Sequence, residues 1–323
     1  MSSKVKIGIV GTGRMGALHL AKFQSLPKAE VVGIYEPNIE RAHELIRTTS
    51  VKAFSSIEEL IFNVDGLVIA TPTSTHFSIA KSALSHGCHV LIEKPFCETL
   101  EEAYQLEQLA KSKGLICQIG FLERFRFEAL MGTYTLSRFS KIQAQRLSTT
   151  VGREVSVDVV SDLMIHDVDL VLSIANEEPT RVTATGFSVV TDYIDFATAK
   201  LEFSSGIVAE LTASRVSSIQ KRSFQIISRG LSCELDFVTN SKFFLERAGE
   251  DTRSNKTISF DALEAQSTNF IEAIMGRTTP KVPAQDGYRV ISTIEKIKTE
   301  VYGEGAKVFY PKTLEISAPI REQ

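Results

Sequence analysis

The segment VKIGIVGTGRMG, residues 5–16, decides the fold of the N-terminal half of this chain. A short apolar run over 5–10 leads directly into the hexapeptide GTGRMG, a complete G-x-G-x-x-G, and helical spacing follows over 14–25. In that setting the first glycine allows a tight turn, the second lets the backbone approach a pyrophosphate, and the third lets the helix pack on the strand. Because the helix N-terminus then faces the anion, the segment predicts a dinucleotide-binding unit.

An acidic residue stands where such a unit would hold a ribose. Glu36 closes the second predicted strand, 20 residues after Gly16. A carboxylate there accepts hydrogen bonds from the ribose diol of NAD and repels the 2′-phosphate of NADP. We therefore predict NAD rather than NADP, with a solvated strand end as the structural alternative for Glu36.

Strand-like apolar runs alternate with helix-like segments through the first 120 residues. The runs occupy 5–10, 30–36, 51–54, 66–70, 89–93 and 115–119. Nearly continuous apolar runs are typical of a parallel sheet buried on both faces. Between the runs, Ser56 with Glu59 and Thr99 with Glu102 have the spacing of capping boxes and predict the starts of helices. We expect residues 1–120 to form a Rossmann domain, a doubly wound parallel α/β sheet.

From residue 121 onward the pattern changes. Strand-like runs follow one another through short turns at 141–148, 181–190, 193–203, 206–215, 221–228 and 231–238, and helical spacing returns at 261–276 and 286–301. Apolar and polar residues alternate over 199–203, which indicates a sheet covered on one face. We expect residues 121–323 to form an α+β domain with a large, mostly antiparallel open sheet.

Composition argues against several classes of partner. The chain has 323 residues and a formal net charge of −3, so it has no basic field for nucleic acid or an anionic membrane. It has no apolar run of about 18 residues, and its four cysteines form no C-x-x-C pair. We predict a cytoplasmic protein without nucleic-acid, membrane or metal partners.

The segment SDLMIHDVDL, residues 161–170, places one histidine among three carboxylates. Helical spacing would put Asp162, His166 and Asp169 on one face. His166, with an ordinary pKa near ~6.5, suits general-base chemistry, and Asp162 would bond the substrate or orient the imidazole. Two other interpretations are an ion pair on a solvated helix and a metal site, although no second histidine or fourth ligand is nearby.

A family resemblance connects these segments. ATPTSTHFSIAKSALSHGCHVLIEKP at 70–95 resembles the glucose-fructose oxidoreductase/inositol dehydrogenase (Gfo/Idh/MocA) family, as do GFLERF at 120–125 and the D-x-x-x-H of 162–166. The resemblance implies an NAD(P)-dependent oxidoreductase acting on CH-OH groups of sugars or polyols, assembled as a homodimer or homotetramer through the C-terminal sheet. It places Lys94 near the nicotinamide and the reacting hydroxyl, and it implies a cis bond before Pro95.

The site predicted from motif and resemblance has two parts. Lys94, Asp162 and His166 would handle the hydroxyl proton while nicotinamide takes the hydride, with either Lys94 or His166 as the proton acceptor. The predicted cofactor contacts are Gly11, Gly13, Arg14, Met15, Gly16, Glu36, Thr71, Pro72, His76, Glu93 and Lys94.

The substrate prediction depends on a departure from the family. Many relatives have glycine where this chain has Met164, and a methionine there would narrow the pocket. The segment looks more like a nucleotide-sugar subgroup, in which UDP-N-acetylglucosamine is oxidised at its 3-hydroxyl. Arginines near the crossover, including Arg126, would meet a diphosphate. The predicted substrate contacts are Lys94, Arg124, Arg153, Met164 and His166; the alternatives are an inositol or free-sugar dehydrogenase and a non-catalytic NAD-binding regulator.

Overall fold

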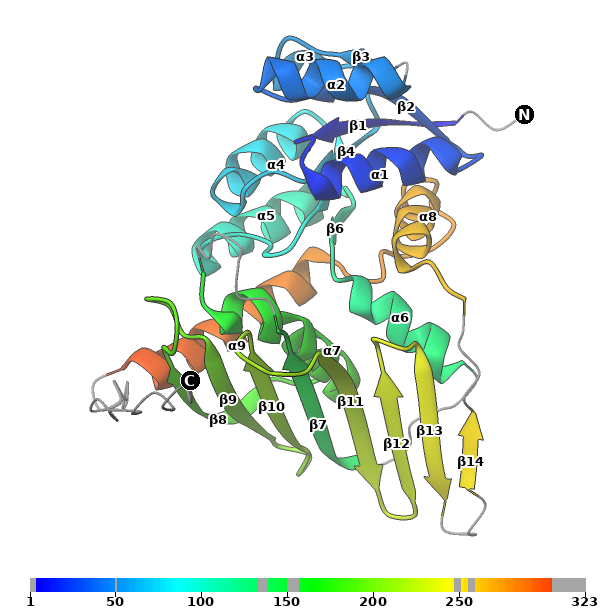
Figure 1. Ribbon diagram of the computed structural model, residues 1–323. Helices are drawn as coiled ribbons and strands as arrows, with labels where there is room; N and C mark the ends of the chain where they lie inside the picture. Colours follow the sequence, from blue (N-terminus) through cyan, green and yellow to red (C-terminus); the bar gives the residue numbers. More distant parts are fainter. Residues whose placement is uncertain are drawn as a thin grey trace, which may run out of the picture.

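A parallel α/β unit and a second, larger sheet make up the protein, as a computed structural model describes it for residues 4–49, 51–132, 139–149, 157–246, 251–254 and 259–303 (Figure 1). The first unit has six parallel strands in the order β3-β2-β1-β4-β5-β6. Its strands are β1 (Val5–Val10), β2 (Ala29–Tyr35), β3 (Lys52–Ala53), β4 (Gly66–Ile69), β5 (His89–Ile92) and β6 (Cys117–Ile119). The predicted doubly wound sheet is confirmed.

The helices of the first unit connect these strands. They are α1 (Arg14–Ser25), α2 (Ile39–Thr49), α3 (Ile57–Ile61), α4 (His76–Ser85) and α5 (Leu100–Lys113), with a 3-10 turn at Thr73–Thr75. Thr99 and Glu102 exchange both bonds of a capping box at the start of α5. Ser56 caps α3 by accepting from the Glu59 amide, but the Glu59 carboxylate bonds Ser55 instead. The sequence therefore predicts the starts of α3 and α5 correctly.

The second unit has eight strands in the order β14-β13-β12-β11-β7-β10-β9-β8. These are β7 (Phe139–Leu147), β8 (Pro179–Phe187), β9 (Phe196–Phe203), β10 (Val208–Ser214), β11 (Lys221–Ser228), β12 (Leu231–Asp236), β13 (Ser241–Glu246) and β14 (Asp251–Ser254). Among the described strands of this second sheet, β7 and β10 are the one parallel pair, and the other neighbours pair antiparallel. The mostly antiparallel sheet is confirmed, whereas β13 and β14 had not been predicted.

One face of the second sheet is covered by helices. Figure 1 shows α6 (Leu122–Met131), α7 (Ile165–Ala175) and α9 (Ala284–Tyr302) on the side of this sheet that faces the first unit. Ile142 and Ala144 of β7 are buried on that side, and Gln143 and Gln145 point to the other, partly exposed side. Because successive side chains of a strand alternate, β7 presents polar side chains to the open face.

The helix α8 (Ala262–Ile274) belongs in space to the first unit. Phe270 and Ile271 are buried with Ile7 and Phe23 in one apolar cluster. Gly66 of β4 packs closely there, since a Cβ at this position would lie 3.0 Å from Ile274 and 3.1 Å from Phe270. The core of the first unit therefore includes α8, whereas the sequence-based domain boundary between residues 120 and 121 places this helix in the second domain.

No helix within the described ranges has the length and apolar composition needed to span a membrane.

Candidate active site

The loops of the candidate site follow the carboxyl ends of parallel strands. The glycine loop follows β1, Thr71 and Pro72 follow β4, and Lys94 follows β5. Parallel strands end at the same edge of a sheet, and β1 and β4 are neighbours at the point where the strand order reverses. Open α/β sheets bind ligands in the crevice at such a switch point.

The glycine loop has the geometry of a pyrophosphate cradle. Gly11 has a φ of +85°, and a Cβ there would lie 2.7 Å from the Ala70 carbonyl oxygen. A Cβ on Gly16 would come within 1.9 Å of the Gly11 oxygen. At Gly13, by contrast, a Cβ would meet nothing within 4 Å, and no described side chain caps the start of α1. Open space beside exposed amides at a helix N-terminus fits the pyrophosphate of a dinucleotide.

Glu36 is fixed beside this loop. Its Oε2 accepts from the Thr12 amide at 2.8 Å and the Thr12 hydroxyl at 2.9 Å, and its Oε1 accepts from the Asn38 amide at 3.1 Å. Burial alone would raise the pKa of Glu36, but these hydrogen bonds and the charge of Arg41 lower it. The carboxylate is therefore ionised and oriented, rather than a freely solvated strand end.

His76 lies at the start of α4 and is buried. Its Nδ1 is 2.9 Å from the Pro95 oxygen and its Nε2 is 2.9 Å from the Thr71 oxygen. Both ring nitrogens are thus engaged within the protein, and the predicted contact of His76 with the cofactor stays a prediction. His76 holds together the loops that follow β4 and β5.

Glu93 is also engaged within the protein. Its Oε1 lies 2.8 Å from Nε2 of the fully buried His19, and its Oε2 accepts from the Lys94 amide at 3.3 Å. Glu93 therefore ties the backbone of Lys94 to α1, and its predicted contact with the cofactor stays a prediction. The sequence predicts only that His19 is structural or exposed, and its position three residues after Gly16 places it on the side of α1 that packs on the sheet.

Lys94 and Asp162 meet across the two units. The Lys94 ammonium lies 3.2 Å from Oδ1 of Asp162 and donates to the Asp162 main-chain oxygen at 3.0 Å. The Lys94–Pro95 peptide bond is cis, as the resemblance implies. Side-chain exposures of 23% for Lys94 and 46% for Asp162 leave the pair open to a substrate.

A π-helical turn changes the direction in which the side chain of Asp162 points relative to the side chains of α7. Val160–Met164 forms this turn, and α7 begins at Ile165. A π turn contains more residues than an α turn, so Asp162 is rotated relative to the positions of α7. Asp162 pairs with Lys94, whereas Asp169 pairs with Arg124 in the interior. The expectation that Asp162, His166 and Asp169 share one helix face is therefore wrong.

His166 lies in a positively charged environment. Its Nδ1 is buried and has no hydrogen-bond partner among the described residues. Burial, and then the charges of Lys94, Arg146, Arg222 and Arg126, hold the pKa of His166 well below 6.5. The imidazole is therefore neutral near neutral pH, which is the form that accepts a proton.

We expect His166 to make the free energy of unfolding depend on pH. Below about pH 6.5 the unfolded chain protonates His166 and the folded chain does not, so stability is lost as pH falls, by up to about 1.4 kcal/mol per pH unit. Urea unfolding of the wild type and His166→Gln between about pH 5 and pH 7 measures this. The substitution should flatten the slope, and equal slopes would contradict the neutral state of His166.

Two predicted substrate contacts are structural residues. Arg124 is 8% exposed and donates to Asp169 at 2.9 and 2.7 Å and to Asp286 at 2.9 Å. Its guanidinium is thus occupied by the buried Asp169 and the half-buried Asp286 and does not meet a diphosphate. Met164 is fully buried in the core, so it does not line an open pocket. Arg153 lies outside the described residues.

Beneath His166 lies an ion cluster that sequence reasoning missed. Arg146 of β7 donates to Asp167 at 3.1 and 2.9 Å and lies 3.4 Å from Glu123 of α6. All three side chains are buried. The alternation of side chains along β7 could have predicted that Arg146 is buried, because it lies two residues after Ala144 and four after Ile142, on the same covered face.

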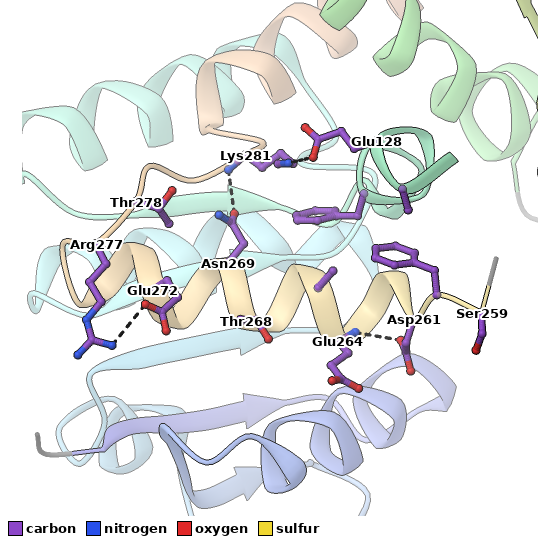
Figure 2. A pocket seen from close by; sticks show the side chains of 14 residues that line it. Glu128, Ser259, Asp261, Glu264, Thr268, Asn269, Glu272, Arg277, Thr278 and Lys281 are labelled. Atoms are coloured by element: carbon purple, nitrogen blue, oxygen red, sulfur yellow. Dashed lines mark hydrogen bonds and ion pairs between the residues drawn. The ribbon is translucent and has the colours of Figure 1, made fainter. Parts of the chain in front are cut away.

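A separate groove of 860 Å³ lies between α6 and α8. Figure 2 shows its two cations paired with carboxylates, Lys281 with Glu128 and Arg277 with Glu272. It contains none of the residues of the Lys94 site, and we assign it no function. No group of three or more potential metal ligands occurs in the described ranges, and the metal-free prediction stays a prediction.

Comparisons with known proteins extend the resemblance over both units. Residues 5–121 match the Gfo/Idh/MocA oxidoreductase family with an NAD-binding Rossmann fold, and residues 128–230 match the C-terminal domain of that family. The N-terminal unit is therefore an NAD-binding Rossmann domain.

Individual relatives give a finer comparison. The UDP-N-acetylglucosamine 3-dehydrogenase of Acidithiobacillus ferrooxidans is 32% identical over 92% of this chain and 97% of its own length. Its solved structure has a TM-score of 0.87 and covers 93% of this chain and 98% of its own. The scyllo-inositol 2-dehydrogenase of Bacillus subtilis is 27% identical over 67% of this chain and 69% of its own length. The WlbA dehydrogenase of Bordetella pertussis, solved with NADH and UDP-GlcNAcA, has a TM-score of 0.81 at 18% identity, with 93% and 96% coverage, and so shows the fold alone.

Proposed function

Because this chain belongs to the Gfo/Idh/MocA family of oxidoreductases, we propose that it oxidises a secondary hydroxyl of a nucleotide sugar with NAD. The proposed substrate is UDP-N-acetylglucosamine and the product its 3-keto form. The observation that carries this choice is the 32% identity to a UDP-N-acetylglucosamine 3-dehydrogenase over 92% of the chain.

Three residues of the chain would handle the hydroxyl proton. When bound, NAD supplies the hydride acceptor. The Lys94 ammonium, oriented by Asp162, would donate to the substrate oxygen and stabilise the alkoxide as it forms. His166, whose lowered pKa keeps the imidazole neutral, would accept the hydroxyl proton. The proposal therefore assigns the proton to His166 and the charge stabilisation to Lys94.

The preference for NAD over NADP is part of the proposal. Glu36 is held by Thr12 at the end of β2 as a carboxylate, where a 2′-phosphate would be repelled. The glycine loop leaves open space at Gly13 for the pyrophosphate. Together these features favour NAD.

A substrate panel tests the proposed function. Purified protein is incubated with NAD or NADP and UDP-N-acetylglucosamine, N-acetylglucosamine, scyllo-inositol or glucose 6-phosphate, and NADH or NADPH absorbance is followed. We expect the highest kcat/KM with UDP-N-acetylglucosamine and NAD, and a product lighter by two hydrogens. Higher kcat/KM with an inositol or free sugar would overturn the substrate choice. NADH binding without turnover of any compound would favour a regulator.

Assembly is a further part of the proposal. The open face of the second sheet carries partly exposed Gln143, Gln145 and Thr212, and we propose that it joins copies of the chain into a dimer or tetramer. Light scattering of the purified protein tests this, and a monomeric mass would reject it. The cytoplasmic location stays a prediction.

A further inference from the structure

Arg222 has an unusual position on the covered face of the second sheet. It lies on β11 directly opposite Arg146 of the antiparallel neighbour β7. Phe224 and Ile226, which follow Arg222 at alternate positions, are buried on that face. Two like charges at opposing strand positions destabilise a sheet unless carboxylates neutralise both.

Carboxylates of the described chain pair with only two of the three arginines near His166, which are Arg126, Arg146 and Arg222. Glu123 lies beside both Arg126 and Arg146, and Asp167 bonds Arg146. Among the described residues, no carboxylate forms an ion pair with the half-buried Arg222. Burial and the charges of Arg146 and Arg126 lower its pKa, although the more distant charges of Glu123 and Asp167 act in the opposite direction. Within the part of the chain that the structure describes, three guanidinium groups thus share two carboxylates, which leaves one positive charge in excess.

The excess charge lies at the catalytic end of the sheet. Arg146 bonds Asp167, the residue that follows His166, and Arg222 is the cross-strand neighbour of Arg146. The side chain of Arg126 is 26% exposed, so this cluster is open to a ligand on that side. Arg222 and Arg126 are both close enough for their charges to act on His166.

We propose that Arg222, with Arg126, forms an anion subsite that binds a phosphoryl group of the substrate. A guanidinium presents paired N–H donors that match phosphate oxygens, and a half-buried one without a carboxylate gains most from such a ligand. The subsite selects phosphorylated or nucleotide sugars over neutral ones. The assignment rests on the proposed function, because it concerns the same substrate.

Binding of the phosphoryl group has a consequence for His166. The negative charge of the phosphoryl group offsets the charges of Arg222 and Arg126, two of the cations that hold the pKa of His166 low. Lys94 and Arg146 remain near His166, each paired with a carboxylate. A phosphorylated substrate therefore makes His166 a stronger base than a neutral sugar does.

Isothermal titration with UDP and with inorganic pyrophosphate tests the subsite without requiring turnover. Arg222→Gln removes the charge, Arg222→Lys retains it, and Arg229→Gln, in the exposed turn after β11, is the matched control. We expect Arg222→Gln to weaken UDP binding by about 10- to 100-fold, as the loss of a charged hydrogen bond predicts. Arg222→Lys should recover part of this affinity, and Arg229→Gln should bind as the wild type does.

Kinetic and binding outcomes separate the subsite from the proposed function. Equal UDP affinity in the wild type and Arg222→Gln, or no binding of either anion to the wild type, overturns the subsite. Binding of either anion that depends on Arg222, without turnover of UDP-N-acetylglucosamine, supports the subsite and overturns the proposed function. A larger effect of Arg222→Gln on KM for glucose 6-phosphate than for UDP-N-acetylglucosamine assigns the site to a monophosphate. NADH affinity of each variant reports on folding.

Discussion

Replacing Lys94 with methionine should lower kcat for the proposed substrate by about 10²- to 10³-fold, with a smaller change in KM. The ammonium lies within 3.2 Å of Asp162 at the mouth of the site, where it would meet the substrate oxygen. Charge stabilisation of a forming alkoxide is needed most in the transition state, so its loss appears mainly in kcat. Steady-state NADH formation with UDP-N-acetylglucosamine measures both constants.

A matched lysine controls for general effects of the substitution. Lys28 pairs with Glu272 through an ion pair at 2.6 Å, and its own side chain is 49% exposed. Lys28→Met should leave kcat within about twofold of the wild type, because exposed ion pairs contribute little. Unchanged kcat in Lys94→Met would remove Lys94 from the chemistry. Full activity in His166→Gln, with activity lost in Lys94→Met, would assign proton transfer to Lys94.

Replacing Arg124 with methionine should lower the free energy of unfolding by about 3–5 kcal/mol. The substitution leaves Asp169 and Asp286 without their shared cation, and Asp169 is completely buried. Burial already raises the pKa of Asp169 to about 6 despite the charge of Arg124. Urea denaturation monitored by circular dichroism at neutral pH measures the loss.

A control variant and a double variant test whether the loss of stability in Arg124→Met comes from the unpaired buried carboxylate. Arg181→Met is the control, because that side chain is 71% exposed and lies 3.9 Å from Glu202, so the expected change is below about 1 kcal/mol. Adding Asp169→Leu to Arg124→Met should restore part of the stability by removing the unpaired buried carboxylate. Unchanged stability in Arg124→Met with a raised KM would instead support the substrate contact expected from sequence.

Local sequence patterns predicted most of the fold. The glycine hexapeptide, the apolar runs and the Thr99 capping box each specify structure through residues near one another in the chain. Strand assignments were most accurate where apolar runs were nearly continuous, as in β1 and β5. By contrast, β13 and β14 at the edge of the second sheet had no such signal and were missed.

The site was predicted only where a motif marked it. Lys94 and Asp162 were assigned to one site by resemblance, and they lie together in the structure. Arg124 was assigned to substrate because its partners, Asp169 and Asp286, are 45 and 162 residues away in the chain. Spacing also misplaced Asp162 relative to Asp169, because it assumed an α-helix through a segment that contains a π turn.

The sequence by itself determined the two architectures, the dinucleotide loop and the residue types available for chemistry. Only the tertiary structure decided which charges are neutralised inside the protein and which remain for a ligand. Arg124 and Arg222 are both arginines near the same site, yet one is enclosed by two carboxylates and the other has none in the described chain. The physical reason is that a charge's partners are set by strand register and helix packing across long sequence separations, which local periodicity does not encode.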